Sequence, residues 1–142
     1  MPKTLMWKKR KAQPPRRRRA KAKAGLQWDD AIELFQTHMH AARKAAGTVE
    51  GNMLEVHRLE RHLRAARLPG EVTIDDLRQY QLGLLSGKLT RLGTPSSPAN
   101  VARIATVHAN FFGFLFDEEK IEANPTRRLE RPRAKTGKLV GD

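Results

Sequence analysis

The sequence contains no cysteine, and its longest apolar segment is the short stretch FFGFLF at 111–116. The absence of cysteine excludes disulfides, a thiolate nucleophile and cysteine-based zinc sites. The apolar stretch is far shorter than the ~20 residues that span a bilayer. No apolar segment follows the basic N-terminus, as a secretory signal requires. We therefore expect a soluble cytoplasmic protein that has no membrane partner.

Motifs for cofactors, metals and catalysis are also missing. There is no HExxH, no P-loop and no glycine-rich dinucleotide fingerprint, so we predict no cofactor, no metal site and no small-molecule substrate. His108 falls on the apolar side of a predicted helix, where we expect a hydrogen-bonded core residue rather than a ligand. Tyr80 is the only tyrosine, and its place in an apolar pattern favours burial over chemistry.

Acidic residues are absent from the first 25 residues, which hold 11 of the 28 lysines and arginines. Residues 26–123 hold 11 basic and 13 acidic residues, whereas 124–142 hold 6 basic and 2 acidic ones, so the net charge of +13 lies in the flanks. Because like charges repel and little can be buried, we expect the arm 1–25 to be disordered.

The arm contains the consecutive arginines Arg16, Arg17, Arg18 and Arg19. We expect them to follow the phosphates of a nucleic acid without reading its sequence, with steep salt dependence. The alternatives are a solubilising tail and a wrongly assigned start codon.

From Trp28 onward, apolar residues recur at spacings of three and four, which predicts helices that each have one buried face. The buried positions are Trp28, Ile32, Phe35, Met39 and Ala42 in the first helix, Met53, Val56, Leu59, Leu63 and Ala66 in the second, Leu77, Tyr80 and Leu84 in the third, and Val101, Ile104, Val107, His108, Phe111, Phe112, Phe114 and Leu115 in the fourth. There is no strand signal. We predict an all-α fold, a four-helix bundle with an adequate but modest core.

Glycine and hydroxyl residues indicate the boundary between the first two helices. Gly47 is expected to end the first helix, and Thr48 is expected to be the N-cap of the second. The segment LPG at 68–70 should terminate the second helix, because proline and glycine both disfavour its continuation.

The third and fourth helices have better defined starts. Thr73 and Asp76 have the spacing of a capping box, with an acid shorter than the usual Glu. A polar loop at 86–98 follows the third helix, with Ser97 as the next N-cap and Pro98 at the first helical position.

The order of these features resembles the N-terminal SAM-like, core-binding domain of tyrosine recombinases, also called phage-type integrases. The likeness covers about residues 26–133 and includes the segments TVEGNMLEVHRLERHL, VTIDDLRQY and VARIATVHANFFGFLFDEEKIEANP. The last segment carries the most specific part of the resemblance. It has an arginine near the start of the helix, aromatic residues near the end of the helix, and then a polar turn, an apolar residue and Asn-Pro. These are Arg103, Phe111, Phe112, Phe114, Ile121, Asn124 and Pro125.

The resemblance implies a four-helix SAM-like orthogonal bundle at 26–123 and a basic interdomain linker at 124–142. In the family, this linker leads to a catalytic domain whose tyrosine attacks a DNA phosphodiester. No counterpart of that domain follows here, so we expect a chain that is non-catalytic by itself, whether a truncated gene product, an engineered piece or a stand-alone domain. The implied partners are double-stranded DNA and other recombinase protomers, in integration and site-specific recombination on the nucleoid.

In the family, the second and fourth helices hold one face of the duplex. Arginine suits guanine edges, asparagine suits adenine edges, and hydroxyls near a helix N-terminus suit phosphate oxygens. The candidate DNA-binding residues are Thr48, Arg58 and Arg61 on the second helix, Lys88, Arg91, Thr94, Ser96 and Ser97 in the loop, and Ala99, Arg103, Thr106 and Asn110 on the fourth helix. Exposed arginine and asparagine are nevertheless ordinary on any helix, and Ser97 also serves as a cap.

A second hypothesis comes from a different functional class. The helical part is slightly acidic, which favours an adaptor whose bundle binds protein while the basic tail binds RNA or an anionic surface. A preference for RNA over duplex DNA is a third hypothesis.

Overall fold

The structure, a computed structural model, describes residues 25–132, so Arg16–Arg19 of the basic arm lie outside the described residues. Within this range it contains four α-helices, one short 3-10 turn and no strand. The elements are α3 (Trp28–Ala41), α4 (Ala46–Leu63), η1 (Pro69–Glu71), α5 (Ile74–Ser86) and α6 (Pro98–Asp117). The all-α class and the number of helices are confirmed. None of these helices combines the length and apolarity that a bilayer crossing requires.

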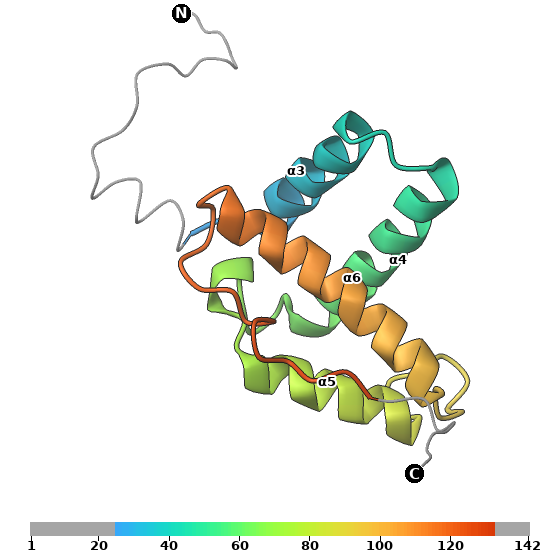
Figure 1. Ribbon diagram of the computed structural model, residues 1–142. Coiled ribbons are helices and arrows are strands. Elements are labelled where there is room, and N and C mark those ends of the chain that lie inside the picture. The colour runs from blue at the N-terminus through green and yellow to red at the C-terminus, as the bar shows by residue number, and fades with distance from the viewer. Residues whose placement is uncertain (1–24, 133–142) are drawn as a thin grey trace, which may run out of the picture.

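The core is built around α6, which contacts each of the other three helices. In Figure 1, α6 passes in front of the end of α4, and α5 lies below it. The aromatic residues of α6 pack against α3. The ring of Phe111 lies parallel to that of Trp28 at 6.2 Å and edge-on to that of Phe35 at 5.3 Å. Phe111 and Phe112 are completely buried. The predicted burial of the fourth helix's apolar face is therefore confirmed for these residues.

His108, also on α6, is buried as predicted, with 1 % of its surface exposed. Neither of its ring nitrogens has a hydrogen-bond partner among the described residues, so the expectation of a hydrogen-bonded core histidine is wrong. Its nearest aromatic neighbours include Tyr80 of α5, at 5.5 Å between ring centres. Burial lowers the pKa of His108 from 6.5 to about 4.

The first helix ends earlier than predicted, at Ala41 instead of Gly47. Arg43 adopts the left-handed conformation with φ of 60°, and its N–H donates to the carbonyl of His40 at 3.0 Å. Such a closure usually contains glycine, because a side chain is strained at positive φ. An arginine in this place is not a helix-stop signal, so the sequence pattern missed it.

The second helix begins at Ala46, after an extended Ala45 that provides no side-chain cap. Thr48 therefore lies inside the first turn of α4, and its predicted role as N-cap is wrong. The helix ends at Leu63, before the 68–70 segment. Two alanines predicted to be buried are exposed because they lie beyond the helix ends; they are Ala42 and Ala66.

The start of α5 agrees with the prediction. The Asp76 N–H donates to the Thr73 hydroxyl at 3.1 Å, and the Thr73 N–H donates to the Asp76 carboxylate at 2.9 Å, which is a complete capping box. Burial by itself would raise the pKa of Asp76, but the hydrogen bonds from Thr73 and Arg67 outweigh it and hold that pKa below its ordinary value.

The start of α6 also agrees with the prediction. The hydroxyl of Ser97 accepts a hydrogen bond from the Asn100 N–H at 3.1 Å, and Pro98 is the first helical residue. Proline fits there because the N–H groups in the first turn of a helix have no intrahelical acceptor, so the N–H group that proline lacks is not needed. The chain direction entering α6 is thus determined locally.

The segment after α6 turns back onto the bundle. Ile121 is buried, and the side-chain oxygen of Asn124 accepts hydrogen bonds from the N–H and the hydroxyl of Thr126, at 2.9 and 2.6 Å. Pro125 and Thr126 are buried, and Leu129 packs against the core. Residues 124–129 are therefore part of the packed body.

Candidate nucleic-acid interface

A hollow of about 500 Å³ opens between α4, the loop that follows α5, and the first turns of α6. It brings together four of the predicted DNA-binding residues, which are far apart in the sequence: Arg58, Arg61, Arg91 and Ser96. The other lining residues are Glu55, His62, Tyr80, Leu84, Leu89, Thr90, Asn100 and Ile104. We call this feature the cationic hollow.

Glu55 joins the two helices at the edge of the cationic hollow. Its Oε2 atom accepts a hydrogen bond from Nη1 of Arg58 at 3.3 Å and from Nη2 of Arg103 at 2.9 Å. Arg103 also donates to the side-chain oxygen of Asn100 at 3.1 Å. Arg103 of α6, a predicted site residue, is therefore held beside Arg58 of α4. We call Glu55, Arg58 and Arg103 the Glu55 cluster.

The exposure of these groups is strongly asymmetric. The side chain of Glu55 is only 2 % exposed, whereas those of Arg58 and Arg103 are 48 % and 53 % exposed. The guanidinium groups thus retain N–H donors that face solvent. Arg61 and Arg91 are exposed and take part in no ion pair with the residues described. These donors suit phosphate oxygens, which arginine binds in a bidentate manner.

Tyr80 forms part of the inner wall of the cationic hollow and is buried, as predicted. Burial and, to a smaller extent, the negative charge of Glu55 raise the pKa of Tyr80 to about 12. The phenol therefore stays protonated at neutral pH.

The loop between α5 and α6 is shaped by Gly87, which ends α5 with φ of 87°. A Cβ atom at Gly87 would lie 2.4 Å from the carbonyl oxygen of Gly93, so the two arms of the loop approach too closely for any side chain there. The Ser96 N–H donates to the carbonyl of Leu84 at 2.9 Å and fastens the loop to α5. This packing places Arg91 and Ser96 against the cationic hollow.

The remaining loop residues of the prediction lie close by. Lys88 and Thr94 are exposed, and the carbonyl of Thr94 accepts a hydrogen bond from the Thr90 hydroxyl at 2.8 Å. The Ser97 hydroxyl is occupied as the cap of α6. Thr48 is exposed at the start of α4 and does not line the cationic hollow.

The outer strip of α6 consists of exposed residues, as the helical spacing predicts. Ala99, Arg103, Thr106 and Asn110 are all exposed, and the Thr106 hydroxyl donates back to the carbonyl of Ala102 at 3.1 Å. The strip therefore continues the surface of the Glu55 cluster along α6.

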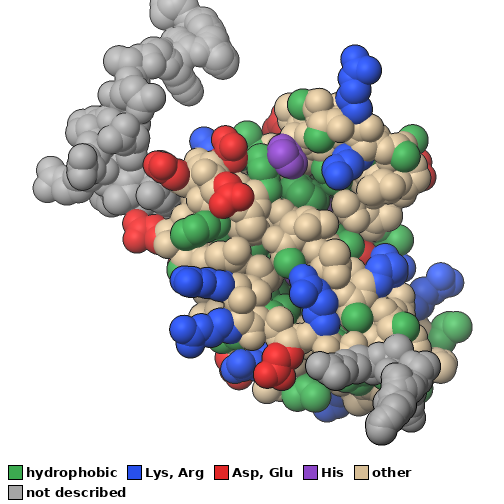
Figure 2. All heavy atoms as spheres, in the orientation of Figure 1, with side chains coloured by type: hydrophobic (Ala, Val, Ile, Leu, Met, Phe, Trp, Pro, Cys, Tyr) green, Lys and Arg blue, Asp and Glu red, His purple; other side chains and the backbone are tan. Residues whose placement is uncertain are grey.

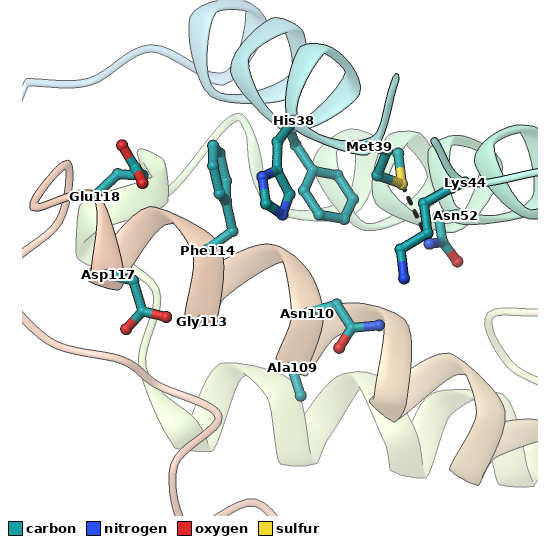
Figure 3. A pocket seen from close by; sticks show the side chains of 11 residues that line it. His38, Met39, Lys44, Asn52, Ala109, Asn110, Gly113, Phe114, Asp117 and Glu118 are labelled. Carbon is teal, nitrogen blue, oxygen red and sulfur yellow. Dashed lines mark hydrogen bonds between the residues drawn. The ribbon is translucent and has the colours of Figure 1, made fainter. Parts of the chain in front are cut away.

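Asn110 lies apart from the arginines, in a second hollow of about 430 Å³ between α3, α4 and α6. In Figure 3 its side chain and that of Lys44 extend toward one another across this space. Gly113 lines the same hollow, and a Cβ atom there would meet only Asn124, at an ordinary distance of 3.8 Å. Packing within the described chain thus does not require a glycine at 113.

Acidic residues gather at the other end of α6 and at the start of α3. They are Asp29, Asp30, Glu33, Asp117, Glu118 and Glu119. In Figure 2 most carboxylates on this face collect at the upper left, where α6 ends in Figure 1, whereas most basic side chains lie over the middle and lower part. Some carboxylates also lie in the lower part and some basic side chains at the top. Charge is therefore unevenly distributed on this face, which total charge alone did not reveal.

Sequence reasoning missed Glu55 as a site residue. Buried glutamates are rare unless they are paired, and the partner on α6 is 48 residues away in the chain. Among residues 25–132, no three His, Asp or Glu side chains are close enough together to hold a metal ion. No family model, no curated protein and no solved structure matches the chain.

Proposed function

We propose that this chain binds double-stranded DNA without cutting it, as the core-binding module of a tyrosine recombinase in integration and site-specific recombination. The observation that carries the proposal is the convergence of arginines from α4, the loop and α6 around one hollow. The proposal includes a SAM-like orthogonal arrangement of the helices, which the crossing of α6 over the end of α4 supports.

Phosphate contacts supply most of the affinity in this proposal, because an array of exposed cations releases counterions from DNA. Arg58, Arg61 and Arg91 contact the backbone around the cationic hollow, and Ser96 adds a hydroxyl. Arg103 is the residue best placed for base contact, since the small side chain of Ala99 lets the strip of α6 approach a groove. The acidic end of α6 is repelled by phosphate, which restricts how the bundle can lie on a duplex.

A non-catalytic role fits the single tyrosine. Tyr80 is buried with its phenol protonated, so it is poorly suited to attack a phosphodiester. In this proposal, cleavage belongs to a catalytic domain of the kind that the family carries.

The experiment must separate the bundle from the basic arm, since the arm alone can bind any polyanion. We would replace the 11 lysines and arginines of residues 1–25 by glutamine in the full chain and call this the arm-neutral protein. Its affinity for a labelled duplex is measured by fluorescence anisotropy across a salt series. We expect weak but salt-dependent binding, and Arg103→Ala should weaken it about tenfold, since one good arginine contact contributes about 1–3 kcal/mol.

Arg78→Ala is the matched control. Arg78 is exposed on α5 and does not line the cationic hollow, so its loss removes the same charge from a different place. Arg61→Ala should reduce the slope of log affinity against log salt by about 0.9, the value for one phosphate contact. Loss of all duplex binding in the arm-neutral protein would refute the proposal. Stronger competition by single-stranded RNA than by duplex DNA would instead indicate an RNA-binding protein.

A protein-binding adaptor is the second candidate, and exposed leucines favour it. Leu82 on α5 is 57 % exposed and Leu92 in the loop is 83 % exposed, so each offers apolar surface that a partner protein could bury. If nucleic-acid binding depends entirely on the arm, these leucines become the best indication of function.

A further inference from the structure

We propose that Glu55 is a positioning residue for DNA binding, which holds the guanidinium groups of Arg58 and Arg103 side by side across the boundary between α4 and α6. The inference rests on the proposed function, because it concerns how the same surface is prepared for a duplex. Glu55 itself does not contact DNA in this proposal.

The geometry supports a holding role. One carboxylate oxygen accepts hydrogen bonds from both arginines, at 3.3 and 2.9 Å, and Asn100 provides Arg103 with a second anchor. Both arginines remain about half exposed, so each keeps donors for a phosphate or a base. A long side chain that is already ordered loses less conformational entropy when it binds.

The energetics indicate that stability does not explain Glu55. Its side chain is 2 % exposed, and its second oxygen, Oε1, is buried without a partner among the described residues. Burying a charge is costly, and replacing a whole buried ion pair by apolar residues is often neutral or stabilising, whereas removing one partner is harmful when the other charge stays buried. Removing the acid would leave only half-exposed arginines, which water can solvate. Glu55→Gln should therefore not destabilise the fold.

An effect of net charge and an effect of side-chain positioning predict opposite changes in DNA affinity for Glu55→Gln. Removing a negative charge beside DNA phosphates should tighten binding if only net charge matters. If Glu55 positions the two arginines, the same substitution should weaken binding. The sign of the change thus distinguishes the two explanations.

Glu60→Gln is the matched control in the arm-neutral full chain. Glu60 is also on α4 and buried, at 7 % exposure, but it pairs with Arg64 and His57 and does not line the cationic hollow. We expect Glu55→Gln to weaken duplex binding about 3- to 10-fold, a change of the size typical for preorganisation of two side chains. Its urea midpoint should stay equal to that of the parent or rise. Glu60→Gln should leave binding unchanged or slightly tighter.

Glu55→Asp supplies a second test, because it keeps the charge and shortens the reach by one methylene. It should also weaken binding, and parent-like affinity for this variant would count against the inference. Three further results would overturn it: equal or tighter binding by Glu55→Gln, a parallel loss of stability and affinity, or the same weakening in Glu60→Gln. In each of these cases, the effect of Arg103→Ala on duplex affinity still tests the proposed function. Absence of duplex binding by the arm-neutral parent would refute the proposed function itself.

Discussion

Lowering the pH from 7.5 to 4.5 should reduce the free energy of unfolding by about 2–3 kcal/mol through His108 alone. The imidazole is buried on α6, 1 % exposed and without a hydrogen-bond partner among the described residues, and burial lowers its pKa from 6.5 to about 4. In the unfolded chain the ring titrates near 6.5, so between these two values the unfolded state binds more protons than the folded state. The contribution of the neutral His108 ring to the free energy of unfolding is therefore fully present above about pH 6.5 and is lost as the pH falls toward 4.

The magnitude follows from linkage between protonation and folding. One pKa unit corresponds to about 1.36 kcal/mol, and integration between the two pKa values gives losses of about 1 kcal/mol at pH 5.5 and about 2–3 kcal/mol at pH 4.5. Carboxylates also titrate in this range, so the loss must be isolated by comparison. His108→Leu removes the titrating ring and sacrifices no hydrogen bond to the described residues.

Urea unfolding monitored by far-UV circular dichroism, at half-unit pH steps, measures the free energy of both proteins. The difference between them should change by about 2–3 kcal/mol from pH 7.5 to 4.5, in favour of the leucine variant at low pH. An NMR titration of the His108 ring should show it neutral at pH 5.5 in the folded protein. A ring that titrates near 6.5, or a difference independent of pH, would refute the reasoning.

Three backbone predictions follow from the helix ends and glycines. Gly87→Ala should destabilise the protein by about 2 kcal/mol or more, because Gly87 has positive φ and a Cβ would collide with the Gly93 carbonyl; a Tm within 2 °C of the parent's would contradict this. Gly113→Ala should stabilise it by up to about 1 kcal/mol, as the helix interior has room for a methyl group, and a lower urea midpoint would argue against that room. Thr73→Ala should cost about 1 kcal/mol by removing the α5 cap, whereas Thr73→Ser should retain most of the stability; equal losses in thermal melts would exclude the capping explanation.

Local features of the sequence were sufficient for several parts of the fold. The helical periodicity predicted an all-α protein, and the starts of α5 and α6 followed from Thr73 with Asp76 and from Ser97 with Pro98. The capping hydrogen bonds, between Thr73 and Asp76 and between Ser97 and Asn100, join residues three positions apart, so sequence spacing alone determines whether they can form. The end of α3 was different, because Arg43 closes the helix in a conformation that its residue type disfavours.

The candidate site shows the limit of local information. Periodicity correctly predicted that Arg58 and Arg103 are exposed on their helices, yet it could not show that one buried carboxylate joins them. It also placed Asn110 and Arg103 on the same helix face, but it could not show that the packing of α3 gives Asn110 a separate hollow.

The sequence by itself therefore determined that there are four helices, which of their faces are buried and where cations are exposed, because these depend on neighbours within one or two turns. Only the tertiary structure decided which exposed cations share a surface and that Glu55 lies between them. The reason is physical: the angles and offsets at which helices cross depend on side-chain packing between segments that are distant in the chain.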